Sequence, residues 1–352
     1  MSTLPESIQR ELTELRSVVA NAQVPQELAL KMEREIVALE RSATLGNYDE
    51  KFEKVSRYIE WIVKIPWAQQ TPDQLDLEKT KAIFEEHHFG MQEVKDRFLE
   101  YVSVLKLRAT QDPESQFKAP IMLLVGLVGT GKTTFAYSLS EALGRKLIRI
   151  PFGGMSSSIE LRGETRFKLG AEPGKVIKGI CAAGVRNPIF LLDEIDRSNE
   201  EANMDIMGVL VELLDPNQNT AYVDNYVDYP INLGQSIFIA TANNTTKIAT
   251  AVLDRMEKIA MPSYTDQEKI VIAHKYIMPE LFKETGLRPD QFKIEDDVWP
   301  LMVRPLGFDA GIRTLQRTLQ TAVRRAARII VERGFSQVVV TRENAKIFLP
   351  GY

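Results

Sequence analysis

The chain has 352 residues, 44% of them hydrophobic, and its 44 Lys and Arg against 48 Asp and Glu give a formal net charge of −4. This length allows two or three domains with substantial cores, and the balanced charge argues against a dedicated nucleic-acid binder, which usually carries a basic face. The one cysteine, Cys181, excludes an internal disulfide, suits a reducing compartment and is expected to be a small buried core residue. No stretch approaches the roughly 20 apolar residues of a membrane span, and the N-terminus lacks a signal-peptide pattern, so we expect a cytoplasmic protein without a membrane partner.

Helical spacing of apolar residues dominates the first part of the chain. Three such runs lie between residues 6 and 65, and a polar stretch at 69–74 follows them as a linker. We interpret residues 1–72 as an N-terminal helical segment, a hairpin that serves as a spacer or packing arm. A sustained coiled coil is disfavoured because the pattern breaks around 21–25 and 46–47.

Apolar strands alternating with helices follow from about residue 75. The strands are expected at 121–125, 147–150, 189–192, 236–240 and 258–261. This alternation predicts an α/β domain over residues 73–262, with a parallel sheet flanked by helices. Amphipathic helices, notably at 266–282 and 311–333, predict a small, mainly helical domain over residues 263–352.

A phosphate-loop pattern, G-x-x-x-x-G-K-[ST], follows the first of these strands and opens a helix. Glycines let backbone N–H groups close on phosphates, and a helix N-terminus adds a favourable dipole. We expect Lys132 to reach the β- and γ-phosphates of ATP and the Thr133 hydroxyl to ligate Mg²⁺. The phosphate-binding residues are therefore expected to be Gly126, Leu127, Val128, Gly129, Thr130, Gly131, Lys132, Thr133 and Thr134.

Two acids end the buried strand at 189–192. We expect Asp193 to bind the Mg²⁺ shell, directly or through water, and Glu194 to polarise the attacking water. Three more residues complete the expected site. Asn243 follows a strand and could orient water near the γ-phosphate, Arg255 could act as an arginine finger for a neighbouring subunit, and Arg313 opens a helix of the small domain. From spacing alone, each of the three is as well explained by a solvated or salt-bridged side chain.

The chain resembles the AAA+ superfamily and, more narrowly, the ATPase part of the Lon protease family. The stretches that carry this resemblance, beyond the phosphate loop, are 58–61, 65–67, 88–95, 153–155, 160–163, 170–175, 187–196, 213–219, 253–257 and 310–315. The resemblance covers nearly the whole chain, from about residue 10 to 350.

The resemblance implies roles for several residues. It makes Asn243 the sensor 1 residue, Arg255 the finger that acts in trans, and Arg313 the sensor 2 residue. It also implies that the segment His88, Phe89 and Gly90 caps the adenine. The implied assembly is a homo-oligomer, a hexameric ring that acts on protein substrates with ATP/ADP and Mg²⁺.

Lon proteins also carry an N-terminal recognition domain and a Ser–Lys peptidase domain, and no stretch here matches either. We therefore expect ATP hydrolysis but no peptide-bond cleavage from this chain. The chain is expected to be either a stand-alone ATPase or a fragment of a longer Lon-like protease, so the peptidase would act in trans or in cis.

The sequence departs from the family pattern in two loops. Leu127 and Val128 stand where two prolines are usual. In the candidate pore loop at 162–170, Lys168 occupies the position of the substrate-gripping aromatic when aligned without gaps. Phe167, Lys168 and Leu169 are therefore the expected substrate-pore residues, against an alternative in which Phe167 is a buried core anchor. Met204, Tyr222 and Tyr226 are candidates for a second pore element, although buried packing explains the two tyrosines equally well.

Three functions remain as hypotheses. The first is a ring-shaped ATPase that unfolds or translocates protein chains. The second is an ATP-dependent scaffold or regulatory switch without threading, which the altered pore loop favours. The third, a DNA-remodelling or clamp-loading protein, lacks a basic stripe, so nucleic acid is not an expected partner.

Overall fold

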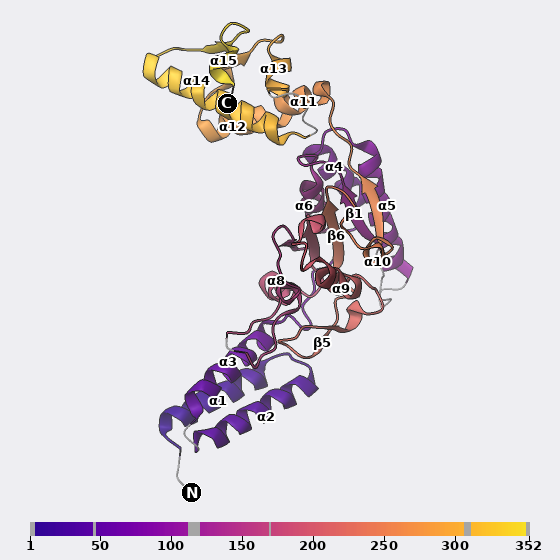
Figure 1. The fold of residues 1–352 in the computed structure, drawn as a ribbon, viewed down its shortest axis with the longest axis vertical. Coiled ribbons are helices and arrows are strands. Elements are labelled where there is room, and N and C mark those ends of the chain that lie inside the picture. The colour runs from indigo at the N-terminus through magenta and orange to yellow at the C-terminus, as the bar shows by residue number, and fades with distance from the viewer. Residues whose placement is uncertain (1–3, 45–46, 112–119, 169, 306–310, 350–352) are drawn as a thin grey trace.

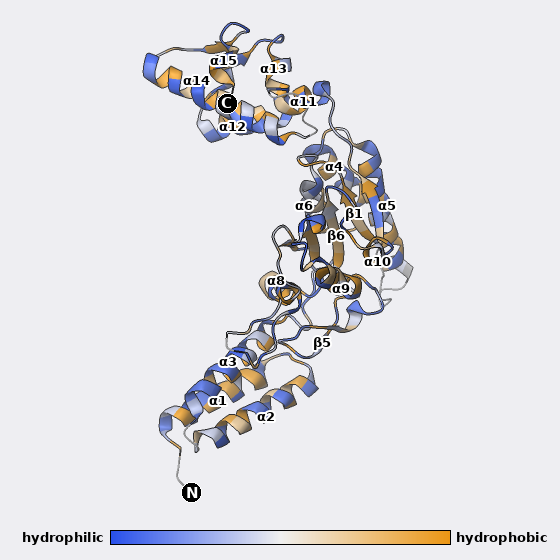
Figure 2. Ribbon diagram, in the orientation of Figure 1, coloured by the Kyte–Doolittle hydropathy of each residue, from blue (hydrophilic) through white to orange (hydrophobic). Residues whose placement is uncertain are grey.

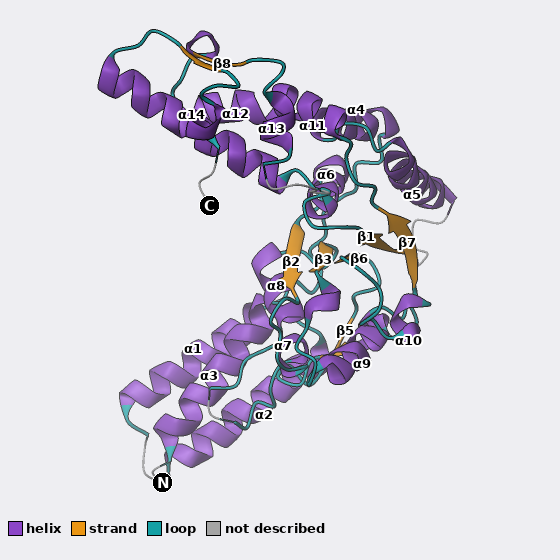
Figure 3. Cartoon of the chain, turned by 45° about the horizontal axis from the view of Figure 1, so that its top comes forward, coloured by secondary structure: helices purple, strands orange, loops and turns teal. Residues whose placement is uncertain are grey.

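A computed structural model of the protein describes residues 4–44, 47–111, 120–168, 170–305 and 311–349 (Figure 1). The chain is extended, with a helical arm at one end, a sheet in the middle and a small domain at the other end. Figure 3 shows the same arrangement after a rotation, with the arm and the small domain on either side of the sheet. The first and the last described residues therefore lie far apart.

The described residues of the N-terminal arm form three helices, one for each apolar run of the sequence, rather than a two-helix hairpin. They are α1 (Glu6–Asn21), α2 (Gln26–Ala43) and α3 (Tyr48–Lys64). Pro25 precedes α2 and cannot continue a helix, which explains the break after α1. Each helix buries one apolar stripe, as the alternating colours in Figure 2 show, and these stripes pack against one another.

The central sheet is five-stranded and entirely parallel, with the strand order β2-β3-β6-β1-β7. Its strands are β1 (Ile121–Val125), β2 (Leu147–Pro151), β3 (Ile189–Asp193), β6 (Ile237–Ala242) and β7 (Met256–Ala260). The predicted α/β class and the predicted strands are confirmed, with small shifts at strand ends. A further hairpin consists of β4 (Tyr222–Val223) and β5 (Pro230–Ile231).

Alternate strand residues enter two different cores, because successive side chains point to opposite faces of a sheet. Met122 and Leu124 pack with helices α4 (Leu77–His87), α5 (Gln92–Gln111) and α6 (Lys132–Leu143). Ile121 and Leu123 belong to the other core. That core also contains residues from α7 (Ile159–Arg162), α8 (Lys175–Ala183), α9 (Asn203–Leu213) and α10 (Thr250–Leu253).

The arm shares this second core with the sheet. Buried residues of α1, α2 and α3 and buried residues of β1, β3 and β6 form one continuous apolar cluster. The arm is therefore joined to the sheet by shared packing rather than held away from it as a spacer. Cys181 of α8, expected to be buried, is only partly buried against this cluster, and desolvation raises its pKa to about 11.

The small domain has its own core. The expected helix at 266–282 is a continuous run of α11 (Asp266–Ile272), the π-helical turn η3 (Ala273–Ile277) and α12 (Met278–Thr285). The remaining elements are β8 (Phe292–Ile294), α13 (Trp299–Val303), α14 (Arg313–Arg333), β9 (Val338–Val340) and α15 (Ala345–Phe348). The short 3-10 turns among the described residues are η1 (Ile195–Arg197), η2 (Asn219–Ala221) and η4 (Pro289–Gln291).

Among the described residues, none of the helices combines the length and the apolar character that a membrane crossing needs.

Candidate nucleotide-binding site

The phosphate loop connects the end of β1 to the start of α6, and its glycines are required by geometry. Gly129 and Gly131 have φ of 84° and 91°, in the left-handed region that favours glycine. A Cβ on Gly126 would lie 2.6 Å from the carbonyl oxygen of Met261, so a larger residue would not fit there. The loop can therefore close tightly before the helix begins at Lys132.

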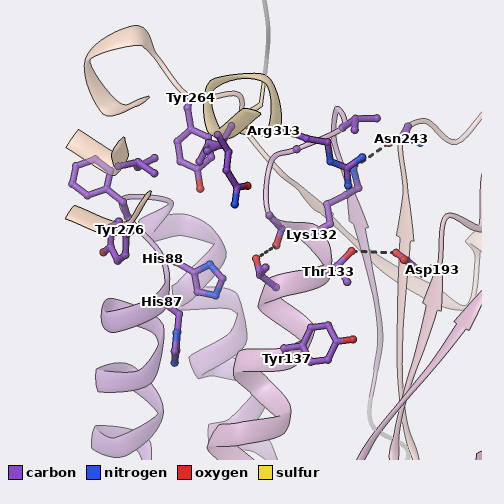
Figure 4. Close-up of a pocket in the computed structure, with 18 of the residues that line it drawn as sticks. His87, His88, Lys132, Thr133, Tyr137, Asp193, Asn243, Tyr264, Tyr276 and Arg313 are labelled. Atoms are coloured by element: carbon purple, nitrogen blue, oxygen red, sulfur yellow. Dashed lines mark hydrogen bonds between the residues drawn. The ribbon is translucent and has the colours of Figure 1, made fainter. Parts of the chain in front are cut away.

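A pocket of about 740 Å³ lies beside this loop. Figure 4 shows Lys132, Thr133 and Asp193 on one side of it and Tyr264 and Tyr276 on the other. The sequence-predicted residues that line it are Val128, Gly129, Gly131, Lys132, Thr133, Thr134, Asp193, Glu194, Asn243, Arg313, His88 and Phe89.

Four of the residues predicted to bind the nucleotide do not line this pocket. Gly126, Leu127 and Thr130 belong to the phosphate loop but do not face the pocket. The Thr130 hydroxyl donates to the carbonyl of Leu127 at 2.9 Å, which stabilises the loop. Gly90, with φ of 62°, forms the turn after His88 and Phe89.

Lys132 is buried at the floor of the pocket. Its Nζ donates to the carbonyl oxygens of Gly126 at 2.6 Å and Leu127 at 2.9 Å, and to Oδ1 of Asn243 at 3.2 Å. Desolvation lowers the pKa of Lys132, and the nearby acids, Asp196 first, oppose that shift. The result is a cation held close to the loop where phosphate oxygens would bind.

Asn243 carries an unsatisfied donor. Its Oδ1 accepts from Lys132, while its Nδ2 is buried without a hydrogen-bond partner among the described residues. A buried amide donor without a partner is costly. A phosphate or water oxygen in the pocket would satisfy it.

Asp193 is the most heavily bonded acid of the site. Its Oδ1 accepts from the hydroxyls of Thr241 at 2.6 Å and Thr133 at 3.3 Å, and its Oδ2 lies 2.6 Å from Nη2 of Arg149. The hydrogen bond to Asp193 raises the pKa of Arg149. This buried carboxylate is thereby fixed beside the hydroxyl of Thr133.

Glu194 adopts a left-handed conformation, with φ of 56°, which is uncommon for a residue other than glycine. Its backbone N–H donates to the Thr241 hydroxyl at 2.8 Å, which holds the turn in place. The side chain is partly exposed, and its Oε2 lies 3.6 Å from Nη1 of Arg197. Strained residues of this kind persist where surrounding contacts fix them, often at functional sites.

The donor set fits a hard divalent cation bound together with a nucleotide. A hydroxyl of Thr133 and a carboxylate of Asp193 are the oxygen ligands that Mg²⁺ prefers, and Mg²⁺ usually completes its shell with phosphates and water. Among the described residues no group of three or more His, Cys, Asp or Glu could hold a metal ion. The cation would therefore be held by Thr133, Asp193 and the phosphates together.

His88 forms part of the wall on the α4 side. Its ring stacks on Phe135 at 3.7 Å between centroids, and its Nε2 lies 2.9 Å from Oγ of Ser138. Burial lowers the pKa of His88 to about 3, so this ring is neutral at physiological pH.

The small domain reaches the phosphate loop directly. Arg313 is the first residue of α14 and lines the pocket, and the preceding N–H of Ile312 donates to the carbonyl of Gly129 at 3.1 Å. A Cβ on Gly311 would lie 2.3 Å from the carbonyl oxygen of Val128. The two backbones thus approach as closely as glycine allows.

Arg255 lies away from this pocket. Its Nη1 donates to the carbonyl of Ala251 at 2.6 Å, and its Nη2 lies 3.2 Å from Oδ2 of Asp215. It does not line the nucleotide pocket of its own chain.

The candidate pore residues divide into exposed and buried groups. Phe167 is 80% exposed, so its alternative interpretation as a buried core anchor is wrong. Lys168 pairs with Glu164 at 2.7 Å, and Leu169 lies outside the described residues. Met204 is 86% exposed, whereas Tyr222 and Tyr226 are buried.

Sequence reasoning missed several residues that line the pocket. Arg149 could have been noticed as a cation inside an otherwise apolar strand. Ile312 lies in the stretch 310–315 but was given no role there. The others carry no motif, and distant parts of the chain bring them together: His87, Tyr137, Arg197, Tyr264, Ile272, Tyr276 and Gln316.

Comparison with known proteins agrees with this geometry. The family model described as "ATPase family associated with various cellular activities (AAA)" matches residues 122–264, and the "Lon protease AAA+ ATPase lid domain" matches residues 283–338. A protein named Lon protease 2 from Thermus thermophilus is 39% identical over 350 residues, which are 98% of this chain and 43% of the relative.

Two further relatives give the same result. The Lon proteases of Dictyoglomus thermophilum and Heliobacterium modesticaldum are 39% and 38% identical over 94% and 99% of this chain, and each match covers 41% of the relative. The chain thus spans about two fifths of the length of the curated relatives it matches. The domain models match the sheet and the small domain, and the relatives align with nearly the whole chain. The chain belongs to the Lon family and corresponds to its AAA+ ATPase region.

Proposed function

We propose that the chain is the motor of a ring, hexameric by family resemblance, that hydrolyses ATP in the cytoplasm to unfold and translocate protein chains. The substrates would be delivered to a Ser–Lys peptidase joined in cis or recruited in trans. The relatives named as Lon proteases support this proposal for the motor region only, because the chain spans about two fifths of their length.

Hydrolysis would use the residues gathered at the pocket. The loop N–H groups and Lys132 bind the phosphates, and Glu194 orients and deprotonates the attacking water. Asn243 would donate its unsatisfied Nδ2–H to that water or to a γ-phosphate oxygen. Mg²⁺ held at Thr133 and Asp193 would neutralise charge on the β- and γ-phosphates.

A ring explains the position of Arg255. This side chain lies outside its own nucleotide pocket, bonded to Asp215, so it would act on the pocket of a neighbouring subunit. Arginine fingers that stabilise transition-state charge are worth about 10³–10⁵ in rate.

Arg313 would report nucleotide state to the small domain. It stands at the start of α14, which is the longest element of that domain, and it lines the pocket without a salt bridge to any described residue. Phosphate binding would pull on this helix and so turn one domain against the other.

The exposure of Phe167 carries the threading part of the proposal. The Phe167 side chain is 80% exposed, so its apolar phenyl group faces water. Such a group can grip an extended polypeptide without reading its sequence. The neighbouring exposed Lys168 would line the same path.

The test is ATPase activity stimulated by an unfolded protein. We expect Phe167→Ala to lose most of the stimulation, because the gripping ring is removed, while nucleotide binding remains. Phe335→Ala, at a 51% exposed phenylalanine of the small domain, is the matched control and should keep the stimulation. Full stimulation of Phe167→Ala would remove the support for threading.

A scaffold or regulatory switch is the second candidate. It is favoured by Lys168, which occupies the expected aromatic position and is tied to Glu164. Such a switch would change its assembly with nucleotide and show no stimulation by unfolded proteins.

A further inference from the structure

Phe167 sits on a loop that is closed at its base. We refer to residues 163–168 as the Phe167 loop. The backbone N–H of Glu164 donates to the carbonyl of Glu172 at 3.2 Å, and the N–H of Lys168 donates to the carbonyl of Thr165 at 3.1 Å. These bonds fix the base and one turn of the loop, but none of them holds the Phe167 ring.

Arg166 joins that ring to the N-terminal arm. The guanidinium carbon lies 4.8 Å from the ring centroid of Tyr58 in α3 and 5.3 Å from that of Phe167. Its Nη2 lies 2.9 Å from Oε1 of Glu35 in α2. Both distances are within the range of a cation–π interaction. The Arg166 guanidinium therefore contacts an exposed aromatic ring, Phe167, and a buried one, Tyr58.

Tyr58 is a rigid support for this cation. It is 2% exposed, its hydroxyl donates to the carbonyl of Val227 at 3.2 Å, and its ring lies 6.1 Å from that of Tyr226. It also belongs to the core that the arm shares with the sheet. A side chain that packs on Tyr58 is therefore anchored to the rigid core shared by the arm and the sheet.

A second contact ties the arm to the same loop. Nη2 of Arg57, next to Tyr58 in α3, lies 2.5 Å from Oε1 of Glu172, whose other oxygen pairs with Lys178 at 2.5 Å. Glu172 is the residue whose carbonyl closes the loop. The arm therefore contacts both the base and the tip of the loop.

We propose that Arg166 is a positioning residue that fixes Phe167 against the arm through Tyr58 and Glu35. The contacts of Arg166 do not depend on the proposed threading function, but their effect on substrate gripping rests on it. An exposed ring makes few packing contacts of its own, so a loop without this bridge would present Phe167 in many orientations. The arm would then set where the substrate is gripped, and gripping would weaken without any change at the nucleotide pocket.

Amide hydrogen exchange of the 352-residue chain tests the geometry. We expect Arg166→Ala to speed exchange of the Lys168 amide, which donates to the carbonyl of Thr165, about tenfold, because the contacts of this turn with Tyr58 and Glu35 are lost. Lys168→Ala is the matched control: it removes the pair with Glu164 in the same loop but no contact with the arm, and it should leave exchange of the amide at residue 168 near the wild-type rate. Wild-type exchange in Arg166→Ala would overturn the proposal.

ATPase stimulation tests the functional consequence. With reduced, carboxymethylated α-lactalbumin as the unfolded probe, we expect Arg166→Ala to raise the KM for the probe about tenfold while the stimulated kcat stays within about twofold. A lowered kcat with unchanged KM would overturn the positioning role. If the wild-type protein were not stimulated at all, the threading function would fail, while the exchange result would still decide the role of Arg166.

Glu35→Gln keeps the test decisive if Arg166→Ala proves unstable. It removes only the ion pair to Arg166 and keeps the side-chain shape, so we expect about threefold faster exchange in the loop. Unchanged exchange in a folded Glu35→Gln variant, together with an unchanged KM, would overturn the proposal.

Discussion

The backbone N–H of Ile312 donates a hydrogen bond of 3.1 Å to the carbonyl oxygen of Gly129, which joins the small domain to the phosphate loop through main-chain atoms. The neighbouring Gly311 has no space for a side chain against Val128 and Gly129. A movement of the phosphate loop must therefore displace residues 311–312, and the reverse also holds. This contact gives a direct route between phosphate binding and the orientation of the small domain.

Gly311→Ala should weaken nucleotide binding. The added Cβ would meet the carbonyl of Val128 at 2.3 Å, so the phosphate loop or α14 must move. Overpacking of this kind costs about 1–3 kcal/mol, which corresponds to about 5- to 150-fold in affinity. Titration with a fluorescent adenine nucleotide measures the change. Gly208→Ala is the control, because a Cβ there meets nothing within 4 Å and alanine favours its helix. Equal affinities of the two variants would show that the contact is unimportant.

Glu194→Gln should bind ATP but hydrolyse it at least about 10²-fold more slowly, because the amide cannot accept the proton of the attacking water. Phosphate release measures the rate, and nucleotide titration confirms binding. Lys132→Ala is the contrasting variant, since it removes the cation beside the loop and should abolish binding itself. Turnover of Glu194→Gln at the wild-type rate would refute the catalytic assignment.

Arg255→Ala should lose ATPase activity by about 10³-fold or more while keeping its nucleotide affinity, since Arg255 does not line the pocket of its own chain. Mixing tests the action in trans. A subunit carrying Arg255→Ala keeps an intact pocket, and a subunit carrying Lys132→Ala keeps an intact arginine. We expect a mixture of the two inactive variants to regain activity. A mixture that stays inactive despite forming mixed rings would argue against the finger.

His88 should make the protein less stable in mild acid. Its pKa falls from 6.5 to about 3 on burial, so between these values the unfolded chain binds a proton that the folded chain does not. This contribution to stability is complete above pH 6.5 and is lost as the pH falls toward 3. The free energy of unfolding should fall by about 2 kcal/mol between pH 7 and pH 5.

Denaturant unfolding at several pH values measures this effect. His88→Gln, which has no titrating group, should show a flatter dependence of unfolding free energy on pH. An NMR titration that placed the pKa of His88 near 6.5 would contradict the prediction.

Much of the nucleotide site was predictable because its residues are local in sequence. The phosphate loop follows one strand and the two acids follow another, and parallel strands bring their carboxyl ends together. Asn243 was found for the same reason, since it follows β6. The roles of Arg255 and Arg313, and the domain borders at residues 72 and 262, stay predictions.

The parts that escaped prediction depend on contacts between distant segments. Tyr264 and Tyr276 line the pocket only because the small domain folds back toward α4, and a lone tyrosine carries no motif. Arg166 and Tyr58 are more than 100 residues apart, so no periodicity relates them. Likewise, the apolar stripes of the arm predicted helices but could not reveal which surface they would cover.

The continuous apolar cluster that unites the arm with the underside of the sheet has a mechanical consequence. The arm and the sheet should behave as one stiff lever, whereas the small domain, with a separate core, can pivot. A movement of the sheet caused by ATP hydrolysis would then move the tip of the arm with it, although the tip lies far from the nucleotide pocket. Tension on that tip should, by the same rigidity, be transmitted back to the phosphate loop.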